Sequence, residues 1–208
     1  KTIEEVGNAG VEVQLQSTLT APNVYGATRA LEWARRRNLD IIFRKGTNIT
    51  RLYNEDSISG VDLDEDAQSF LADFLASSRL DEVTSSPARR LFYEDLTHRL
   101  TTGDARKAPC IFQSEGIVLS AHGDLFHCSI SEESIGNALT ESAHKQYFSS
   151  RSAAIRESLI KNVCPECVHD QSGAWNPATL IAHSLSRVNV LRKVLWATAA
   201  VPVVGGLL

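Results

Sequence analysis

Four cysteines are the residues of this chain whose type and spacing point most clearly to chemistry. They are Cys110, Cys128, Cys164 and Cys167, spaced C-x17-C-x35-C-x2-C. A CxxC pair can present two thiolates to one metal, because the turn between the cysteines leaves both side chains on the same side. Four thiolates suit either a zinc ion or an iron–sulfur cluster. Spacing alone leaves zinc, a cluster and unrelated cysteines open, and simple burial is the competing interpretation for Cys110, which precedes Ile111 and Phe112.

Two histidines lie next to these cysteines and are candidates for a supporting role. His127 precedes Cys128, and His169 follows Cys167 by two positions. Either ring can donate a hydrogen bond to a ligand sulfur, as residues around metal sites commonly do. Because four cysteines suffice to hold the metal, we expect neither histidine to be a ligand.

Further candidates lie on and after a predicted strand, Val11–Thr20. Alternate residues in its middle are polar, namely Gln14, Gln16 and Thr18. A polar side of this strand faces either a ligand or solvent. Gln16 and Asn23, which follows the strand, are therefore the candidate cofactor contacts, although Asn23 can equally cap the next helix. Arg44 and Lys45 follow a second strand and can bind a carboxylate, with exposed loop cations as the simpler interpretation.

The elements that must position these residues begin with a βαβ unit in residues 1–54. The strand Val11–Thr20 is followed by a helix over Val24–Asn38 and by a buried strand at Leu39–Phe43. Short connections between a strand, a helix and a strand predict two parallel strands.

Residues 55–107 are predicted to form a helical connector. An acidic run, Asp62–Asp66, precedes an apolar pattern of helical period and is better explained as a helix N-terminus than as a metal-binding loop. Ser86 and Pro87 are expected to begin a second helix, which Gly103 ends.

Residues 108–172 contain all four cysteines. Short strands at Ile117–Leu119 and Leu125–Cys128 predict a hairpin. A helical pattern over residues 137–160 then leads to the CxxC pair. Because a hairpin brings its ends together, we expect the first two cysteines to lie close to each other.

Residues 173–208 are predicted to form a C-terminal helix over Ala178–Arg192 and an uncharged apolar tail, Val194–Leu208. The tail is shorter than the roughly 20 residues that span a bilayer. We therefore expect it to pack on the protein or on a partner, in preference to anchoring at a membrane surface.

Composition excludes several classes of protein. The 208 residues are 43% hydrophobic, which is ample for a packed core and excludes a disordered or collagen-like chain. Four cysteines are too few to form a disulfide framework in a chain this long. The CxxC pair therefore indicates a reducing, cytoplasmic setting. A net charge of −4 argues against a general nucleic-acid-binding surface.

Residues 108–169 resemble the auxiliary-cluster region of radical S-adenosylmethionine enzymes of the SPASM/twitch group. The matching features are Cys110 before the hairpin, Gly123-Asp124 with Cys128 four positions on, Ile135-Gly136-Asn137 before a helix, and Cys164-Pro-Glu-Cys167. The resemblance implies one auxiliary [4Fe–4S] cluster held by the four cysteines, as in the shorter twitch type. The βαβ unit is also similar to the later units of the partial barrel in these enzymes. The implied fold is α/β, the end of a partial βα barrel followed by a small α+β auxiliary-cluster domain.

One feature of this family is absent from the 208 residues. Its CxxxCxxC loop binds the cluster that cleaves S-adenosylmethionine, so the resemblance implies that this loop, a second [4Fe–4S] cluster and S-adenosylmethionine belong to a part upstream of Lys1. The expected activity is an oxidoreductase-type hydrogen abstraction from a peptide or a small molecule. An electron donor such as a flavodoxin or ferredoxin is then the expected partner, with the auxiliary cluster in electron transfer. The alternative is a non-enzymatic zinc-binding interaction module.

Overall fold

The protein is described here by a computed structural model that covers residues 2–46, 61–77, 86–131, 133–169 and 173–185. Its contacts divide the chain into two units, Lys1–Ala174 and Trp175–Leu208. The first unit is a mixed α/β structure whose described residues form two small sheets. In the second unit a helix covers residues 177–185. The remainder of the helix predicted over Ala178–Arg192, and the tail Val194–Leu208, lie outside the described residues.

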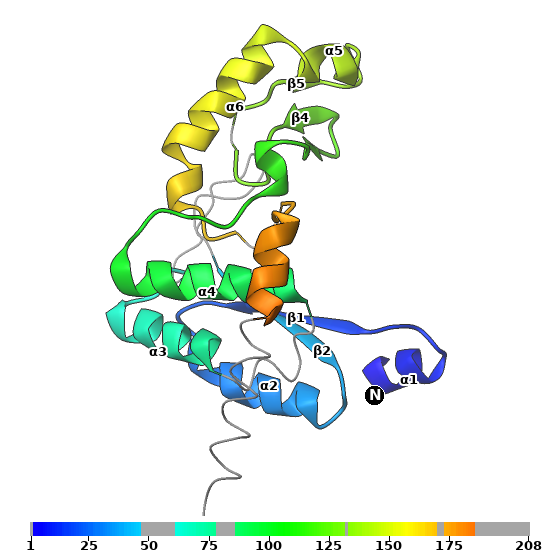
Figure 1. The fold of residues 1–208 in the computed structure, drawn as a ribbon. Helices are drawn as coiled ribbons and strands as arrows, with labels where there is room; N and C mark the ends of the chain where they lie inside the picture. The colour runs from blue at the N-terminus through cyan, green and yellow to red at the C-terminus, as the bar shows by residue number, and fades with distance from the viewer. Residues whose placement is uncertain (1, 47–60, 78–85, 132, 170–172, 186–208) are drawn as a thin grey trace, which may run out of the picture. The chain divides into compact units, whose positions relative to one another are not determined.

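The predicted βαβ unit is confirmed. After a short helix, α1 (Thr2–Asn8), strands β1 (Gln14–Leu19) and β2 (Asp40–Lys45) pair in parallel (Figure 1). A single 3-10 turn, η1 (Val24–Gly26), and helix α2 (Ala27–Arg35) connect them. Helix α2 forms because alanine and leucine recur on one side of it, and that side is fully buried.

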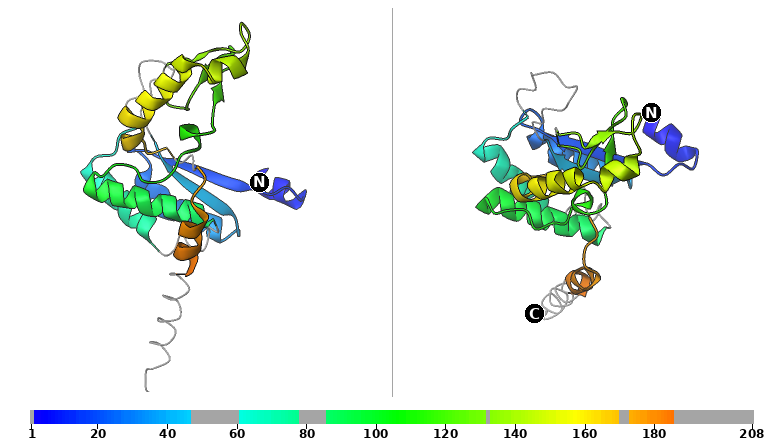
Figure 2. Two further views of the ribbon diagram at one scale, coloured as in Figure 1. Left: turned by 45° about the horizontal axis from the view of Figure 1, so that its top comes forward. Right: turned by 90° about the horizontal axis from the view of Figure 1, so that it is seen from above.

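Two helices follow the βαβ unit, as predicted, and lie side by side (Figures 1 and 2). Helix α3 (Glu65–Ala76) begins at Asp64, whose carboxylate accepts a hydrogen bond from the Ala67 N–H at 2.8 Å. The acidic run is therefore a helix N-terminus. Helix α4 (Pro87–Thr102) begins after Ser86 and ends at Gly103, whose φ of 73° suits glycine.

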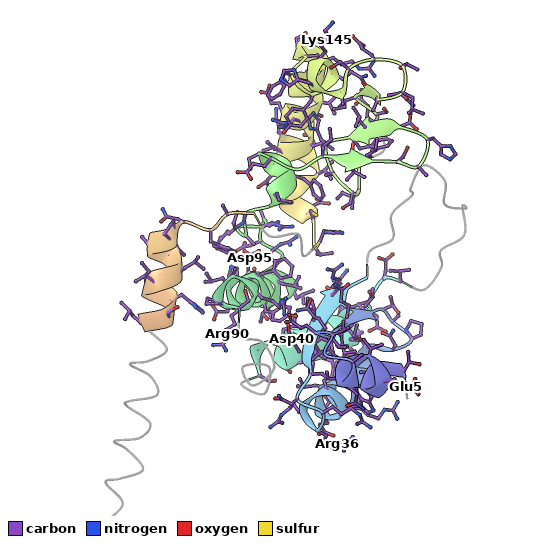
Figure 3. The ribbon with its side chains drawn as sticks, turned by 90° about the vertical axis from the view of Figure 1, so that its right-hand side faces the viewer. Glu5, Arg36, Asp40, Arg90, Asp95 and Lys145 are labelled. Atoms are coloured by element: carbon purple, nitrogen blue, oxygen red, sulfur yellow. The ribbon has the colours of Figure 1, made fainter. Side chains whose placement is uncertain are left out.

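Helix α4 covers the edge of β2 that faces away from β1. The Tyr93 hydroxyl accepts a hydrogen bond from the Phe43 N–H at 2.9 Å and donates one to the Phe43 carbonyl at 3.2 Å. Arg89 pairs with Asp40 at 3.2 Å, and Figure 3 shows Asp40 beside the helix that carries Asp95. The helix thereby satisfies backbone groups that a neighbouring strand satisfies elsewhere in sheets.

The cysteine-bearing part contains the predicted hairpin and one strand more. Strands β3 (Val118–Leu119) and β4 (Asp124–Phe126) are antiparallel, and β5 (Gly136–Asn137) pairs with β4 on its other side. Helices α5 (Ala143–Tyr147) and α6 (Ser150–Asn162) follow.

The single helix predicted over residues 137–160 is wrong in its first half. Asn137 lies in β5, where its side-chain amide donates to Asp124 and to the His122 carbonyl, both at 2.9 Å. The chain also breaks before α6, because the Ser149 hydroxyl accepts from the Ser152 N–H at 3.1 Å and starts a new helix there. Long-range contacts of one side chain and a capping serine thus override the helical pattern.

No membrane-spanning helix is present in the part of the chain that the structure describes, because none of its helices combines the length and the apolar character required.

Candidate metal centre

The structure brings the four predicted cysteines to the wall of one cavity. Cys110 precedes a single turn, η3 (Ile111–Gln113), and Cys128 follows β4, while Cys164 and Cys167 bracket a second turn, η4 (Cys164–Glu166). Each is a free, partly buried thiol. Counted out to its open mouth, the cavity encloses about 490 Å³. The role of the four cysteines as metal ligands stays a prediction.

The turn η4 explains why the last two cysteines face the same cavity. The Cys167 N–H donates to the Cys164 carbonyl at 3.2 Å, which closes a tight turn. Pro165 stands at its first position, where proline's fixed φ favours such a turn and its missing N–H is not needed.

The thiols lie within electrostatic reach of one another. Burial raises the pKa of the Cys128 thiol, and the neighbouring Cys167 and Cys164 raise it further. Hydrogen bonds from the backbone N–H groups of Ile130 and Ser131 lower this pKa but do not cancel the rise. The pKa of Cys164 is raised by burial and by Cys167 and Cys110, although a hydrogen bond from the Gln113 side chain opposes this. Thiols whose pKa is raised, as at Cys128 and Cys164, become thiolates readily only when a bound cation compensates their charge.

Zinc ions and iron–sulfur clusters both take cysteine sulfurs as ligands. Among the described residues, no three His, Cys, Asp or Glu side chains are placed to hold a single metal ion. A zinc ion draws four sulfurs to within about 2.3 Å of one point. The described lining of the cavity contains these four cysteines and no carboxylate. Four thiols without a carboxylate are a donor set that suits zinc and iron–sulfur clusters alike.

Hydrogen-bond donors surround the sulfur of Cys167. The Arg106 guanidinium lies 3.7 Å from Sγ, and the His169 backbone N–H donates to the same atom at 3.4 Å. Arg106 also donates to the carbonyls of Ala108 and His169, at 2.7 and 2.6 Å. Donors of this kind stabilise negative charge on a sulfur that ligates a metal.

A second arginine holds the CxxC turn from helix α4. Arg99 donates to the carbonyls of Cys167 at 2.7 Å and Pro165 at 3.2 Å. Sequence reasoning missed both Arg99 and Arg106. Their partners lie 61 to 68 positions further along the chain, and no local pattern marks such a contact.

The two predicted histidines behave differently from each other. His127 is 1% exposed, and its Nε2 lies 2.7 Å from the Ser152 carbonyl while its Nδ1 accepts from the Nε of Arg156 at 3.4 Å. Because both ring nitrogens bond elsewhere, the prediction that this ring donates to a cysteine sulfur is wrong. His169 supplies its backbone N–H instead of its ring, which lies 3.3 Å from the Ser129 hydroxyl.

The candidate cofactor contacts lie on the βαβ unit and do not line the cysteine cavity. Gln16 is exposed, and in the parallel pairing it lies beside Ile42 of β2, on the same side of the sheet. Asn23 accepts from the Thr20 N–H at 2.9 Å and donates to the Thr18 carbonyl at 3.1 Å. Its side chain makes no capping hydrogen bond to the following turn, so the capping interpretation is wrong. Contact of either residue with a cofactor stays a prediction.

Lys45, one of the two predicted carboxylate-binding residues, lines a second cavity. Arg99 and Glu166 also line it, and counted to its mouth it encloses about 820 Å³. Burial lowers the pKa of Lys45, and the positive charge of Arg99 lowers it further. The negative charge of Asp62 raises this pKa but does not cancel the decrease. Arg44 is half-buried and does not line this cavity.

No protein-family model and no curated protein matches the sequence. A solved structure described as histidine-tagged anSMEcpe with bound AdoMet is similar to this chain, with 14% sequence identity and a TM-score of 0.45. The similarity covers 73% of this chain and 41% of that one, so the chain spans less than half of the structure it resembles. At this identity and score the similarity establishes neither a shared fold nor a family.

Proposed function

We propose that the chain holds one [4Fe–4S] cluster on Cys110, Cys128, Cys164 and Cys167. The observation that carries the proposal is the convergence of four thiols from distant parts of the chain on one cavity. The resemblance of residues 108–169 to an auxiliary-cluster region favours a cluster over the alternative zinc module.

The proposed role of the cluster is electron transfer. Four cysteines would ligate one iron each, so no iron would be left open for a substrate. A [4Fe–4S] cluster bound there would accept and donate single electrons. The chain's own contribution is to bury the cluster and to donate hydrogen bonds to its ligands, from Arg106 and His169 to Cys167 and from the Gln113 side chain to Cys164. Such bonds and the burial of the site set the reduction potential.

We further propose that the chain belongs to a radical S-adenosylmethionine enzyme of oxidoreductase type, with a peptide or a small molecule as substrate. This part of the proposal is supported by the resemblance of residues 108–169 and by the parallel βαβ unit. It assigns S-adenosylmethionine, a second [4Fe–4S] cluster and the CxxxCxxC loop to sequence outside the 208 residues. A flavodoxin or ferredoxin is the proposed electron donor, and Gln16 and Asn23 are the proposed cofactor contacts on this chain.

The test is metal analysis of the protein at its natural length, purified without oxygen. We expect a brown protein, and a variant with both C164A and C167A that contains about four fewer irons and sulfides per chain. S158A is the matched control, because Ser158 is exposed on α6 and does not line the cavity. S-adenosylmethionine cleavage should persist in the double variant while product formation stops. A colourless protein with about one zinc per chain, lost in the double variant, would show that the zinc alternative is right.

A further inference from the structure

Arg156 on helix α6 has a buried donor that packing within the chain does not satisfy. Its side chain lines the cysteine cavity, and its Nη2 atom is buried without a hydrogen-bond partner among the described residues. Burying part of a permanently charged guanidinium without an acceptor is unfavourable. Such an atom in a cavity is explained when a bound group supplies the acceptor.

The rest of the guanidinium is fixed in place. Its Nε donates to Nδ1 of His127 at 3.4 Å, and its central carbon lies 4.6 Å from the centre of the Tyr147 ring. His127 is itself held by the Ser152 carbonyl at 2.7 Å and hydroxyl at 2.8 Å. Because a carbonyl only accepts, the His127 proton lies on Nε2, and Nδ1 is left as the acceptor for Arg156. His127 and Ser152, which are both fully buried, are thus positioning residues for this guanidinium.

The cavity offers Arg156 no carboxylate among its described lining residues, whereas four cysteine sulfurs share that lining. Arg106, the other arginine in the described lining, already donates to three backbone carbonyls and approaches Cys167. A cluster held by four thiolates carries a net negative charge and has sulfur atoms that accept hydrogen bonds. Charge and hydrogen-bonding capacity therefore match the unsatisfied Nη2.

We propose that Nη2 of Arg156 donates a hydrogen bond to a sulfur of the bound cluster and raises its reduction potential. This inference rests on the proposed cluster. A hydrogen bond and a nearby positive charge stabilise the reduced cluster more than the oxidised one, since reduction adds a negative charge. Removing both therefore makes the cluster harder to reduce.

The experiment compares the midpoint potential of the auxiliary cluster in the intact protein with those of R156M, R156K and R151M. Arg151 is the matched control, because it lies on the same helix with 68% of its side chain exposed. We expect R156M to weaken one-electron reduction about tenfold or more, which lowers the midpoint by about 59 mV. R156K keeps the positive charge without the planar guanidinium, so it should lower the midpoint potential less than R156M. R151M should leave the midpoint potential unchanged.

A purely structural role for Arg156 makes a different prediction. R156M also removes the bond from Nε to His127 and the contact with Tyr147, so the urea midpoint of the metal-free variant, compared with that of R151M, measures this structural contribution separately. Loss of iron by R156M at unchanged metal-free stability would support the proposal. An unchanged potential in loaded R156M would overturn this inference alone, and so would a loss of metal-free stability without a potential shift. A wild-type protein that binds no cluster would overturn both this inference and the proposed function.

Discussion

The contact between Tyr93 and the edge of β2 allows a quantitative prediction for Y93F. The substitution removes one hydroxyl and leaves the ring in place. Tyr93 is 3% exposed and Phe43 1% exposed, so water cannot replace the lost partner. Both the N–H and the carbonyl of Phe43 then lose their bonds to this hydroxyl. Each unsatisfied buried group costs about 1–3 kcal/mol, so we expect the two groups left by Y93F to destabilise this edge by about 2–6 kcal/mol.

Amide hydrogen exchange measures this effect where it arises. A loss of about 2–6 kcal/mol corresponds to an increase of roughly 30- to 25,000-fold in the exchange rate of the Phe43 amide, if it opens with the sheet. Y25F is the matched control, because the Tyr25 ring is 58% exposed, and it should leave the Phe43 amide unchanged. A rate in Y93F within a factor of three of wild type would refute the conclusion that α4 substitutes for a strand at this edge.

Three further predictions concern single residues around the sheet and the CxxC turn. R99M removes two bonds to the turn, so a chelator should strip the metal several-fold faster while the initial metal content stays the same. A hydrogen bond from His98 lowers the pKa of Asp104. The stability that this bond contributes is therefore present above the ordinary carboxyl pKa and is lost as the pH falls through the lowered value. H98A should return the pKa of Asp104, measured by an NMR titration, to its usual range. Gly136 has a φ of 152°, and an added Cβ would clash with the Gln146 amide oxygen, so G136A should lower the free energy of unfolding by at least about 1–3 kcal/mol, as measured by urea titration.

The parts of the fold that sequence predicted correctly depend on local patterns. The βαβ unit follows from alternation and helical period, and α4 follows from Ser86, Pro87 and Gly103 at its two ends. The missed strand β5 depends on Asn137 reaching residues 13 to 15 positions earlier, which no local pattern contains.

The candidate site shows the same division. Residue type and the CxxC spacing identified the cysteines, but chain neighbourhood misled for His127. His127 and Cys128 follow β4, and the alternation of sides typical of a strand would explain how Cys128 faces the cavity while His127 is buried against Ser152. That alternation was readable from the sequence. The unsatisfied donor of Arg156 was not, because it depends on how α6 packs.

Mössbauer spectroscopy of protein grown on iron-57 tests the central claim most directly, since it identifies the iron centres and counts them. We predict that the wild-type spectrum contains a [4Fe–4S] component, in an amount of one cluster per chain, that is missing when Cys164 and Cys167 are both replaced by alanine and is retained in S158A. A spectrum that the double replacement leaves unchanged would contradict the assignment of these cysteines as cluster ligands.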